Sequence, residues 1–261
     1  MNSLKIVFVA FSENSLGRRI IKGLVSNGNK PIATFMASDA AFKAFRKNGF
    51  RRYYKKNGVL NTIWRVYYRL TLRRDVKKSS LNLDGNLNQS IKDVCSSNEI
   101  QIEYFDNIND IKFVKKLKHL APDLIVLGGA PLIKKQIIEL PKIAVLNSHP
   151  GILPQAKGLD VVAQSIIDNV PLGITVFKVD EGIDSGAILM EKFLNKNIEG
   201  LKLHEIEALV EELSANAMLE SIEMIKNGNY SFIPQTEKGN IYKALNYHKY
   251  KLVKALLSKK K

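Results

Sequence analysis

The sequence predicts an α/β domain with a mostly parallel sheet. Two observations favour this class: several short runs are apolar throughout, as in strands buried on both faces of a sheet, and segments with helical spacing of apolar residues separate them. A chain that alternates strands and helices in this way forms right-handed β-α-β units around a parallel sheet. With 261 residues, 45% of them hydrophobic, the chain can form one large domain, or one domain with an appendage.

The first β-α-β unit lies at the N-terminus. Residues 5–10 (KIVFVA) are apolar after the lysine and predict a strand. Residues 15–26 carry apolar side chains at helical spacing and are followed by Asn27-Gly28, which is typical of a helix end. Residues 31–36 (PIATFM) predict the second strand.

The alternation resumes after residue 100. We expect strands at 101–105, 123–127 and 143–146, with a helix at 110–120.

Two further strands are predicted at 173–179 and 187–191. We expect them to pair antiparallel across the glycine-bounded turn at 182–186. A long amphipathic helix is predicted at 203–225.

Between about residues 40 and 95 the alternation breaks down, and the composition becomes basic and rich in aromatic residues. From Lys43 to Lys78 there are thirteen Lys or Arg and one acid, Asp75, and residues 62–73 have a helical pattern with an aromatic and a cationic face. Three interpretations remain open, and we rank first a helix packed on the domain, with Lys and Arg stems covering apolar surface. The second is a surface that binds phosphate-bearing partners such as RNA or a nucleotide-linked substrate. The third is contact with an anionic membrane surface.

Net charge, cysteine content and the length of the apolar runs limit the class of protein. A net charge of +15 attracts phosphates, nucleic acid or an anionic membrane face. The one cysteine, Cys95, cannot form an internal disulfide, which fits a reducing compartment, and we interpret it as a small core residue. No apolar run reaches the roughly 18 residues of a membrane span, and the N-terminal run is interpreted as a strand rather than a signal peptide. We therefore expect a cytoplasmic protein.

The stretch VLNSHPGILP places polar residues at the carboxyl end of a predicted strand, where ligands bind in open parallel sheets. In an extended segment residues i and i+2 share a side, so Asn147 and His149 can face one pocket while Ser148 turns away. Histidine can transfer a proton near neutral pH, and an asparagine amide can donate to a developing oxyanion. Taken alone, this pattern favours an ordinary turn histidine.

A second polar stretch, VDEGIDSG, forms an acidic loop between two predicted strands. Asp180 and Asp184 are both candidates to approach His149, and a carboxylate beside an imidazole orients it and favours its protonated form. The alternative is an ordinary hairpin turn rich in Asp and Gly. No second histidine lies at a metal-ligand spacing, so no metal site is predicted.

Together these stretches resemble the formyltransferase family, which includes glycinamide ribonucleotide, methionyl-tRNA and sugar N-formyltransferases. The resemblance covers roughly residues 5–36 and 100–191, and it is specific because the Asn-x-His-Pro and Asp-x-Gly elements occur in order and at a suitable distance. The residues that carry it are Asn147-Ser148-His149-Pro150-Gly151-Ile152-Leu153-Pro154, Lys157-Gly158, Gly173-Ile174-Thr175-Val176, Asp180-Glu181-Gly182-Ile183-Asp184-Ser185-Gly186 and Ile188-Leu189, with a weaker similarity at Pro234-Gln235-Thr236-Glu237, Gly239 and Tyr242.

The resemblance implies a Rossmann-like fold, with a mostly parallel sheet and helices on both faces, that passes the formyl group of 10-formyltetrahydrofolate to an amine without a metal. By position, Asn147 would stabilise the tetrahedral oxyanion, His149 would polarise it or act as acid and base, and Asp184 would hold His149 and help move protons. The folate would lie against two segments, which consist of Gly129, Ala130, Pro131, Leu132 and Ile133, and of Val179, Asp180, Glu181, Gly182 and Ile183.

The chain also departs from the family pattern. Gly151 stands where Ser is frequent, Phe177 where many members have His, and 155–157 (QAK) where an aromatic residue with Arg or Pro is usual. The loop 12–15 lacks the glycine-rich phosphate loop of the purine-pathway members, which disfavours glycinamide ribonucleotide as acceptor. Residues 196–261 are too few for the separate barrel domain of methionyl-tRNA formyltransferases.

We therefore predict a catalytic domain over 1–233 that contains the basic insertion, and a short basic C-terminal extension over 234–261. The predicted activity is folate-dependent N-formyl transfer to a small anionic acceptor, such as a nucleotide-linked amino sugar. The alternatives are a formyltetrahydrofolate hydrolase, an enzyme like methionyl-tRNA formyltransferase, and a non-catalytic RNA-binding descendant. Nucleic-acid or membrane-surface contact through 43–78 has no motif to support it.

Overall fold

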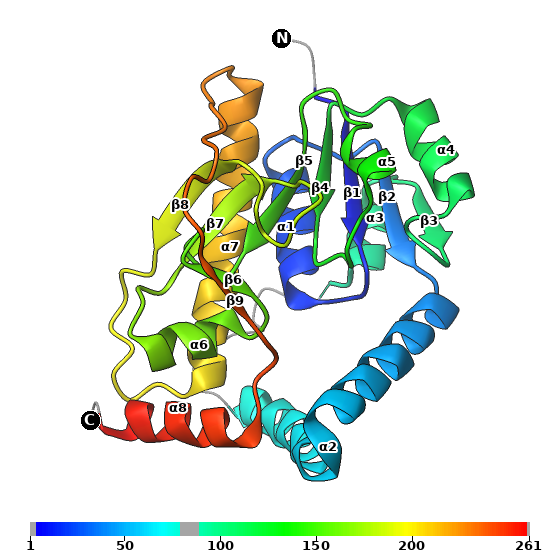
Figure 1. Cartoon of the computed structure of the whole chain (residues 1–261). Coiled ribbons are helices and arrows are strands. Elements are labelled where there is room, and N and C mark those ends of the chain that lie inside the picture. Colours follow the sequence, from blue (N-terminus) through cyan, green and yellow to red (C-terminus); the bar gives the residue numbers. More distant parts are fainter. Residues whose placement is uncertain (1–3, 79–88, 260–261) are drawn as a thin grey trace.

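The computed structural model describes residues 4–78 and 89–259. Its centre is a seven-stranded sheet with the order β3-β2-β1-β4-β5-β7-β8 (Figure 1). The strands are β1 (Ile6–Ala10), β2 (Ala33–Ala37), β3 (Ile102–Phe105), β4 (Leu124–Leu127), β5 (Ala144–His149), β7 (Gly173–Lys178) and β8 (Ile188–Phe193). The first five are parallel, whereas β7 is antiparallel to β5 and to β8. The predicted mostly parallel sheet and the antiparallel pair are confirmed.

Helices cover both faces of this sheet. Alternate residues of β1 enter two separate cores: Ile6 and Phe8 pack with one, and Val7 and Val9 with the other. Burial on both faces is the reason that the strand is apolar throughout. The first core is covered by α1 (Ser15–Ser26), α3 (Ile91–Ser97) and α7 (Leu203–Lys226), and the second by α4 (Ile111–Leu120) and α5 (Lys135–Ile138).

The strand β5 extends beyond its run of apolar residues, so the predicted end at Leu146 was wrong. Its parallel pairing with β4 stops at Leu146, but its antiparallel pairing with β7 continues to His149, opposite Thr175. Asn147 and His149 therefore lie in the strand itself and not in the loop after it. They still extend beyond the last parallel pairing with β4, at the edge of the sheet where ligands bind.

Several elements were not predicted. A second, two-stranded sheet joins β6 (Ala156–Gly158) to β9 (Asn240–Tyr242), and α6 (Val161–Asp168) follows β6. After β9 the chain forms α8 (Tyr247–Lys259), which packs on α6. Pairing of β9 with β6 brings part of the predicted C-terminal extension into contact with the chain just after Asn147 and His149.

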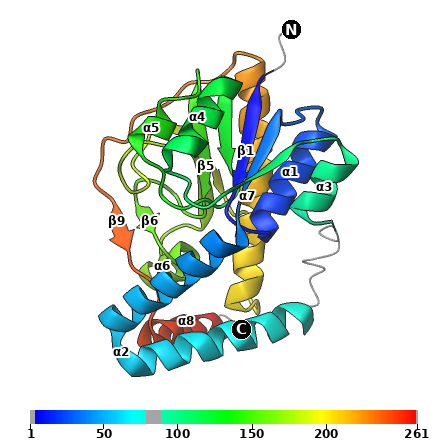
Figure 2. The same cartoon turned by 90° about the vertical axis from the view of Figure 1, so that its right-hand side faces the viewer.

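The predicted helix at 62–73 belongs to α2 (Asp39–Lys78), which is broken at Gly58. Gly58 has φ 76° and ψ −179°, a backbone conformation that glycine adopts without a steric penalty. Residues 39–57 and 59–78 form the two arms of α2. The first arm leads away from the end of β2, and Figures 1 and 2 place the second arm beside α8 at one end of the molecule. In the described part of the chain, no helix combines the length and apolar character needed to span a bilayer.

Candidate active site

The polar end of β5 divides its side chains between the two faces of the sheet, as alternation predicts. Ser148 is buried, and its hydroxyl donates to the carbonyl of Ser214 in α7 at 3.2 Å. Asn147 and His149 have the same parity as Val145, which lies in the core on the opposite face. The Asn147 side chain is only partly buried, and its amide makes no hydrogen bond to any described residue. Its N–H and carbonyl groups are therefore available to a ligand.

His149 is held by contacts at both ring nitrogens. Its side chain is almost fully buried, and Nε2 lies 2.8 Å from the carbonyl oxygen of Ala156 in β6. Since a carbonyl can only accept, we assign the proton to Nε2. Nδ1 lies 3.6 Å from Oδ2 of Asp184, which is too far for a direct hydrogen bond.

The electrostatic surroundings of His149 favour the neutral ring. Burial lowers the pKa of His149 below its usual value of 6.5, since the charged form is poorly solvated in the interior, and the positive charge of Lys157 lowers it further. Asp184 and the Ala156 carbonyl act in the opposite direction, but burial has the larger effect. At neutral pH the ring is therefore a base with its lone pair at Nδ1, facing a carboxylate.

Of the two candidate carboxylates, only Asp184 approaches His149. Asp184 adopts a left-handed conformation (φ 48°), and its Oδ2 accepts from the backbone N–H of Gly158 at 2.8 Å. Asp180 instead stabilises its own turn, because its Oδ1 accepts from the Gly182 N–H at 3.0 Å and the Ser185 hydroxyl at 2.7 Å.

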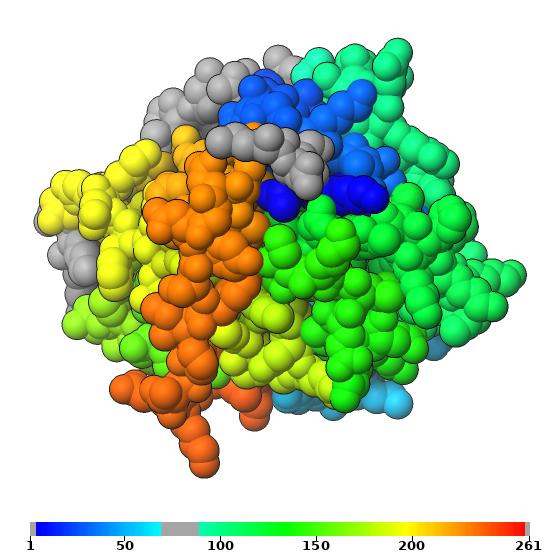
Figure 3. Space-filling model, turned by 90° about the horizontal axis from the view of Figure 1, so that it is seen from above, coloured from blue at the N-terminus to red at the C-terminus, as the bar shows by residue number. Residues whose placement is uncertain are grey.

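The segment 233–242, which we call the strap, fixes the loop that carries Asp184. The side-chain amide of Gln235 donates to the carbonyls of Asp184, at 3.0 Å, and Gly186, at 2.7 Å. Ile233 pairs with Ile188 at the start of β8, and β9 pairs with β6, whose Ala156 binds His149. In Figure 3 the orange segment after α7 runs along the surface beside the yellow-green part of the chain. Our interpretation of the sequence missed this role, although the similarity at Pro234-Gln235 indicated the position.

The departure at Gly151 has a structural reason. A Cβ at this position would lie 2.9 Å from the Ala156 oxygen and 2.5 Å from Cγ1 of Val161. The Ala156 oxygen is the acceptor that holds His149, so a side chain at position 151 would occupy space that this oxygen needs.

The two segments predicted to contact the formyl donor lie on the same face of the sheet as Val145, Asn147 and His149. Ala130, Ile133 and Val179 all pack against the core on this face. Lys135, which begins α5 two residues after the first segment, forms an exposed ion pair with Glu181 of the second, with Nζ and Oε1 3.8 Å apart. At the rim, Leu132 is 78% and Ile183 is 48% exposed, so apolar surface remains uncovered there. Binding of the donor by these segments stays a prediction.

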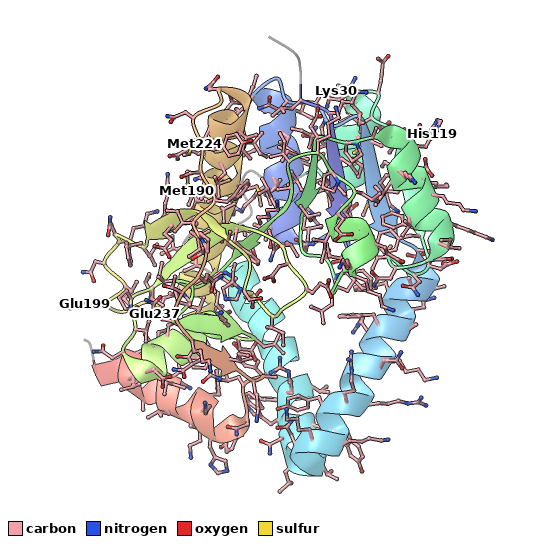
Figure 4. The ribbon with its side chains drawn as sticks, turned by 45° about the horizontal axis from the view of Figure 1, so that its top comes forward. Lys30, His119, Met190, Glu199, Met224 and Glu237 are labelled. Atoms are coloured by element: carbon pink, nitrogen blue, oxygen red, sulfur yellow. The ribbon has the colours of Figure 1, made fainter. Side chains whose placement is uncertain are left out.

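The candidate site does not include His119. His119 is exposed on α4, and Figure 4 shows it well away from β8, where Met190 is labelled. Within residues 4–78 and 89–259 no three His, Cys, Asp or Glu side chains form a group suited to a metal ion. The hollow of about 420 Å³ lined by Asn48, Arg51, Arg52 and Lys55 lies on α2 and not at His149.

The chain is similar to known formyltransferases. A family model described as formyl transferase matches residues 85–222, which is more than half of the chain. A methionyl-tRNA formyltransferase of Thermodesulfovibrio yellowstonii is 33% identical over 136 residues, covering 50% of this chain and 43% of that protein. One from Methylacidiphilum infernorum is 33% identical over 149 residues, with 56% and 46% covered. The chain thus spans about half the length of the curated relatives it matches.

Solved structures support the fold. A 4-N formyltransferase from Francisella tularensis has a TM-score of 0.56 at 19% identity, covering 96% of this chain and 80% of that one. The formyltransferase PseJ from Anoxybacillus kamchatkensis has a TM-score of 0.51 at 24% identity, with 64% and 91% covered. These structures share the fold, and the match to the family model shows that the chain belongs to the formyltransferase family.

Proposed function

We propose that the protein is a folate-dependent N-formyltransferase that moves a formyl group from 10-formyltetrahydrofolate to the amine of a small anionic acceptor. The observation that carries this proposal is the arrangement of His149, which is buried, neutral and held between the Ala156 carbonyl and the Asp184 carboxylate. The amide of Asn147, which no described residue engages, lies on the same face of β5. An acid/base group beside an oxyanion donor is what acyl transfer requires.

In the proposed reaction the acceptor nitrogen attacks the formyl carbon, and negative charge develops on the formyl oxygen. The Asn147 amide would donate to that oxygen and stabilise the charge. Nδ1 of His149 would take the proton that the attacking amine loses, and the Asp184 carboxylate would stabilise the imidazolium that forms. The gap of 3.6 Å between Nδ1 and Oδ2 leaves both acceptors open to an N–H donor.

The segments around the site fit an aromatic, partly apolar formyl donor. Ala130, Ile133 and Val179 offer apolar surface on the face of Asn147 and His149, and Leu132 and Ile183 extend it at the rim. Folate itself supplies the carbonyl carbon and the leaving nitrogen: as the tetrahedral intermediate collapses, the bond between the formyl carbon and the folate nitrogen would break, and that nitrogen would take the proton from His149. This chain would supply the surface, the oxyanion donor and the base.

The acceptor class rests on charge and on the relatives. Lys157 is buried close to His149, where it can pair with an acceptor phosphate. PseJ was crystallised in complex with a nucleotide-linked formamido sugar and tetrahydrofolate, which favours a nucleotide-linked amino sugar here. The curated relatives are named methionyl-tRNA formyltransferases, so an aminoacyl-tRNA amine is the second candidate.

The test is an acceptor screen with purified protein and 10-formyltetrahydrofolate. Tetrahydrofolate release is followed by absorbance, and product formylation by mass spectrometry. Asn147→Ala and His149→Ala should each lower kcat by about 100-fold or more. The matched control His119→Ala, at an exposed histidine on α4, should remain at wild-type activity.

Three outcomes would contradict the proposal. Tetrahydrofolate release at full rate without any amine would indicate a hydrolase. Formylation of methionyl-tRNA in preference to the amino sugars would replace the acceptor class. Near-wild-type turnover in Asn147→Ala or His149→Ala would exclude the mechanism.

A further inference from the structure

The second arm of α2 turns its apolar side chains outward. Among residues 59–68, every side chain that is exposed to solvent is apolar. We call this set the outer stripe; it consists of Val59 (53% exposed), Leu60 (83%), Ile63 (61%), Val66 (45%) and Tyr67 (65%). Large apolar side chains gathered on one exposed helix face mark a surface that binds something.

The inward face of the same arm combines polar and aromatic side chains, and these already have partners. Arg65 donates to Asp160 at 3.0 Å and to the Leu245 carbonyl at 3.1 Å, and Asn61 accepts from the backbone N–H of Tyr247 at 3.2 Å. Trp64 stacks on Tyr68, with ring centroids 5.5 Å apart. The helix is therefore held in this orientation, and turning the outer stripe inward would break these contacts.

The charge of the protein is concentrated around this surface. Residues 39–78 and 247–259, which form α2 and α8, contain seventeen of the chain's 40 Lys and Arg but only two of its 25 Asp and Glu. The rest of the chain is neutral, with 23 basic and 23 acidic residues. Since α2 and α8 lie together at one end of the molecule (Figure 2), that end carries the positive excess.

The first arm of α2 adds three cations that line an open surface hollow. Arg51, Arg52 and Lys55, together with Asn48, line it, and its volume is about 420 Å³. None of these three cations forms an ion pair with a described residue. Unpaired guanidinium and ammonium groups in a concave surface bind phosphate-bearing groups.

We propose that α2 docks the protein on an anionic lipid bilayer, with the outer stripe entering the headgroup region and the cations binding lipid phosphates. Basic helices with an exposed apolar face bind in this way. A second copy of the chain fits poorly, because two such ends would bring positive charge against positive charge. RNA fits poorly as well, since Val59, Leu60, Ile63 and Val66 cannot stack on bases as aromatic side chains do.

The experiment measures sedimentation of the full chain with vesicles of phosphatidylcholine alone or mixed with phosphatidylglycerol. Binding is expected only to the anionic vesicles and should weaken as salt is added. The triple variant Leu60→Ser, Ile63→Ser, Tyr67→Ser should lower partitioning by about tenfold or more. Its matched control carries Tyr104→Ser, Ile111→Ser and Phe193→Ser, which are also exposed, and should bind as wild type.

A second pair of variants tests the charges. Arg51→Gln, Arg52→Gln, Lys55→Gln should lower anionic-vesicle binding and its salt dependence. Lys112→Gln, Lys115→Gln, Lys118→Gln, which removes equal charge from exposed positions on α4, should leave both nearly unchanged.

Several results would overturn the proposal. One is absence of binding to anionic vesicles, and another is full binding by the outer-stripe variant. A third is binding of a tRNA, but not of vesicles, that depends on the α2 cations and not on the outer stripe. That result would show that this surface binds nucleic acid. If the wild type is a dimer and the outer-stripe variant a monomer with unchanged vesicle binding, the partner is a second copy. None of these readouts requires formyl transfer, so their failure is separate from failure of the proposed function.

Discussion

The decisive residue-scale feature is the way that the two nitrogens of His149 are occupied. Nε2 donates to a backbone carbonyl, and Nδ1 faces a carboxylate that is itself held by the Gly158 N–H. A neutral imidazole with one committed nitrogen has a single lone pair to offer, and it is directed at Asp184. This protonation state and tautomer are the ones that the proposed base needs.

This arrangement predicts the pH profile of turnover. Burial lowers the pKa of His149 below 6.5, so the active neutral form persists until the pH falls through that lowered value. The acidic limb of kcat/KM against pH should therefore lie below pH 6.5. Asp184→Asn removes the charge that raises the pKa, so the limb should shift further down while the maximal rate falls. An acidic limb of kcat/KM with its midpoint at or above pH 6.5 would contradict this prediction.

A substitution at Gly151 should damage the site through the backbone. Gly151→Ser places a Cβ against the Ala156 oxygen and Val161, and relief requires a shift of the carbonyl that holds His149. We expect a loss of about 1–3 kcal/mol in unfolding free energy together with reduced turnover. Gly49→Ser is the matched control, since nothing lies within 4 Å of a Cβ there. Equal melting temperatures for the two variants would show that the space at Gly151 is available.

At the scale of elements, the strap joins parts of the chain that are distant in sequence. It pairs with β6 and β8, and its Gln235 holds the loop of Asp184. A segment that lies almost entirely outside the predicted catalytic domain thus fixes both the carbonyl and the carboxylate that surround His149.

Removing the Gln235 amide should loosen the loop without unfolding the domain. Gln235→Ala is expected to lower kcat by about 10- to 100-fold, because Asp184 would no longer be fixed relative to His149. Backbone amides of 179–187 should also exchange hydrogen faster, which a purely chemical defect would not cause. Glu237→Ala, at an exposed position of the same segment (Figure 4), is the control. Unchanged exchange with unchanged kcat would assign no positioning role to Gln235.

At the scale of the whole molecule, a desolvated carboxyl group on α7, that of Glu207, makes stability depend on pH. Desolvation and the nearby charges of Asp160 and Glu211 raise the pKa of Glu207 from 4.5 to about 7, although Arg65 acts against them. A carboxyl group with a raised pKa binds more protons in the folded state, so stability declines as pH rises from about 4.5 through 7.

Glu207→Gln should remove that decline. We expect the variant to be more stable than wild type by on the order of 1–3 kcal/mol at pH 8, with little difference at pH 4.5. Thermal unfolding at both pH values measures it, and Glu212→Gln, at an exposed position of the same helix, is the control. A gain that is the same at both pH values would mean that Glu207 does not titrate in this window.

The sequence by itself determined the α/β alternation, the parallel sheet, and the identity of Asn147, His149 and Asp184 as candidates, because hydrophobic periodicity and short polar motifs are local properties. Only the tertiary structure decided that Asp184 rather than Asp180 meets His149, since both occupy one loop and differ in which way that loop folds. It also decided the roles of the Ala156 carbonyl and Gln235, and the outward direction of the apolar side chains on α2. Each of these depends on contacts between residues far apart in the chain, and no local sequence pattern indicates which surfaces will pack together.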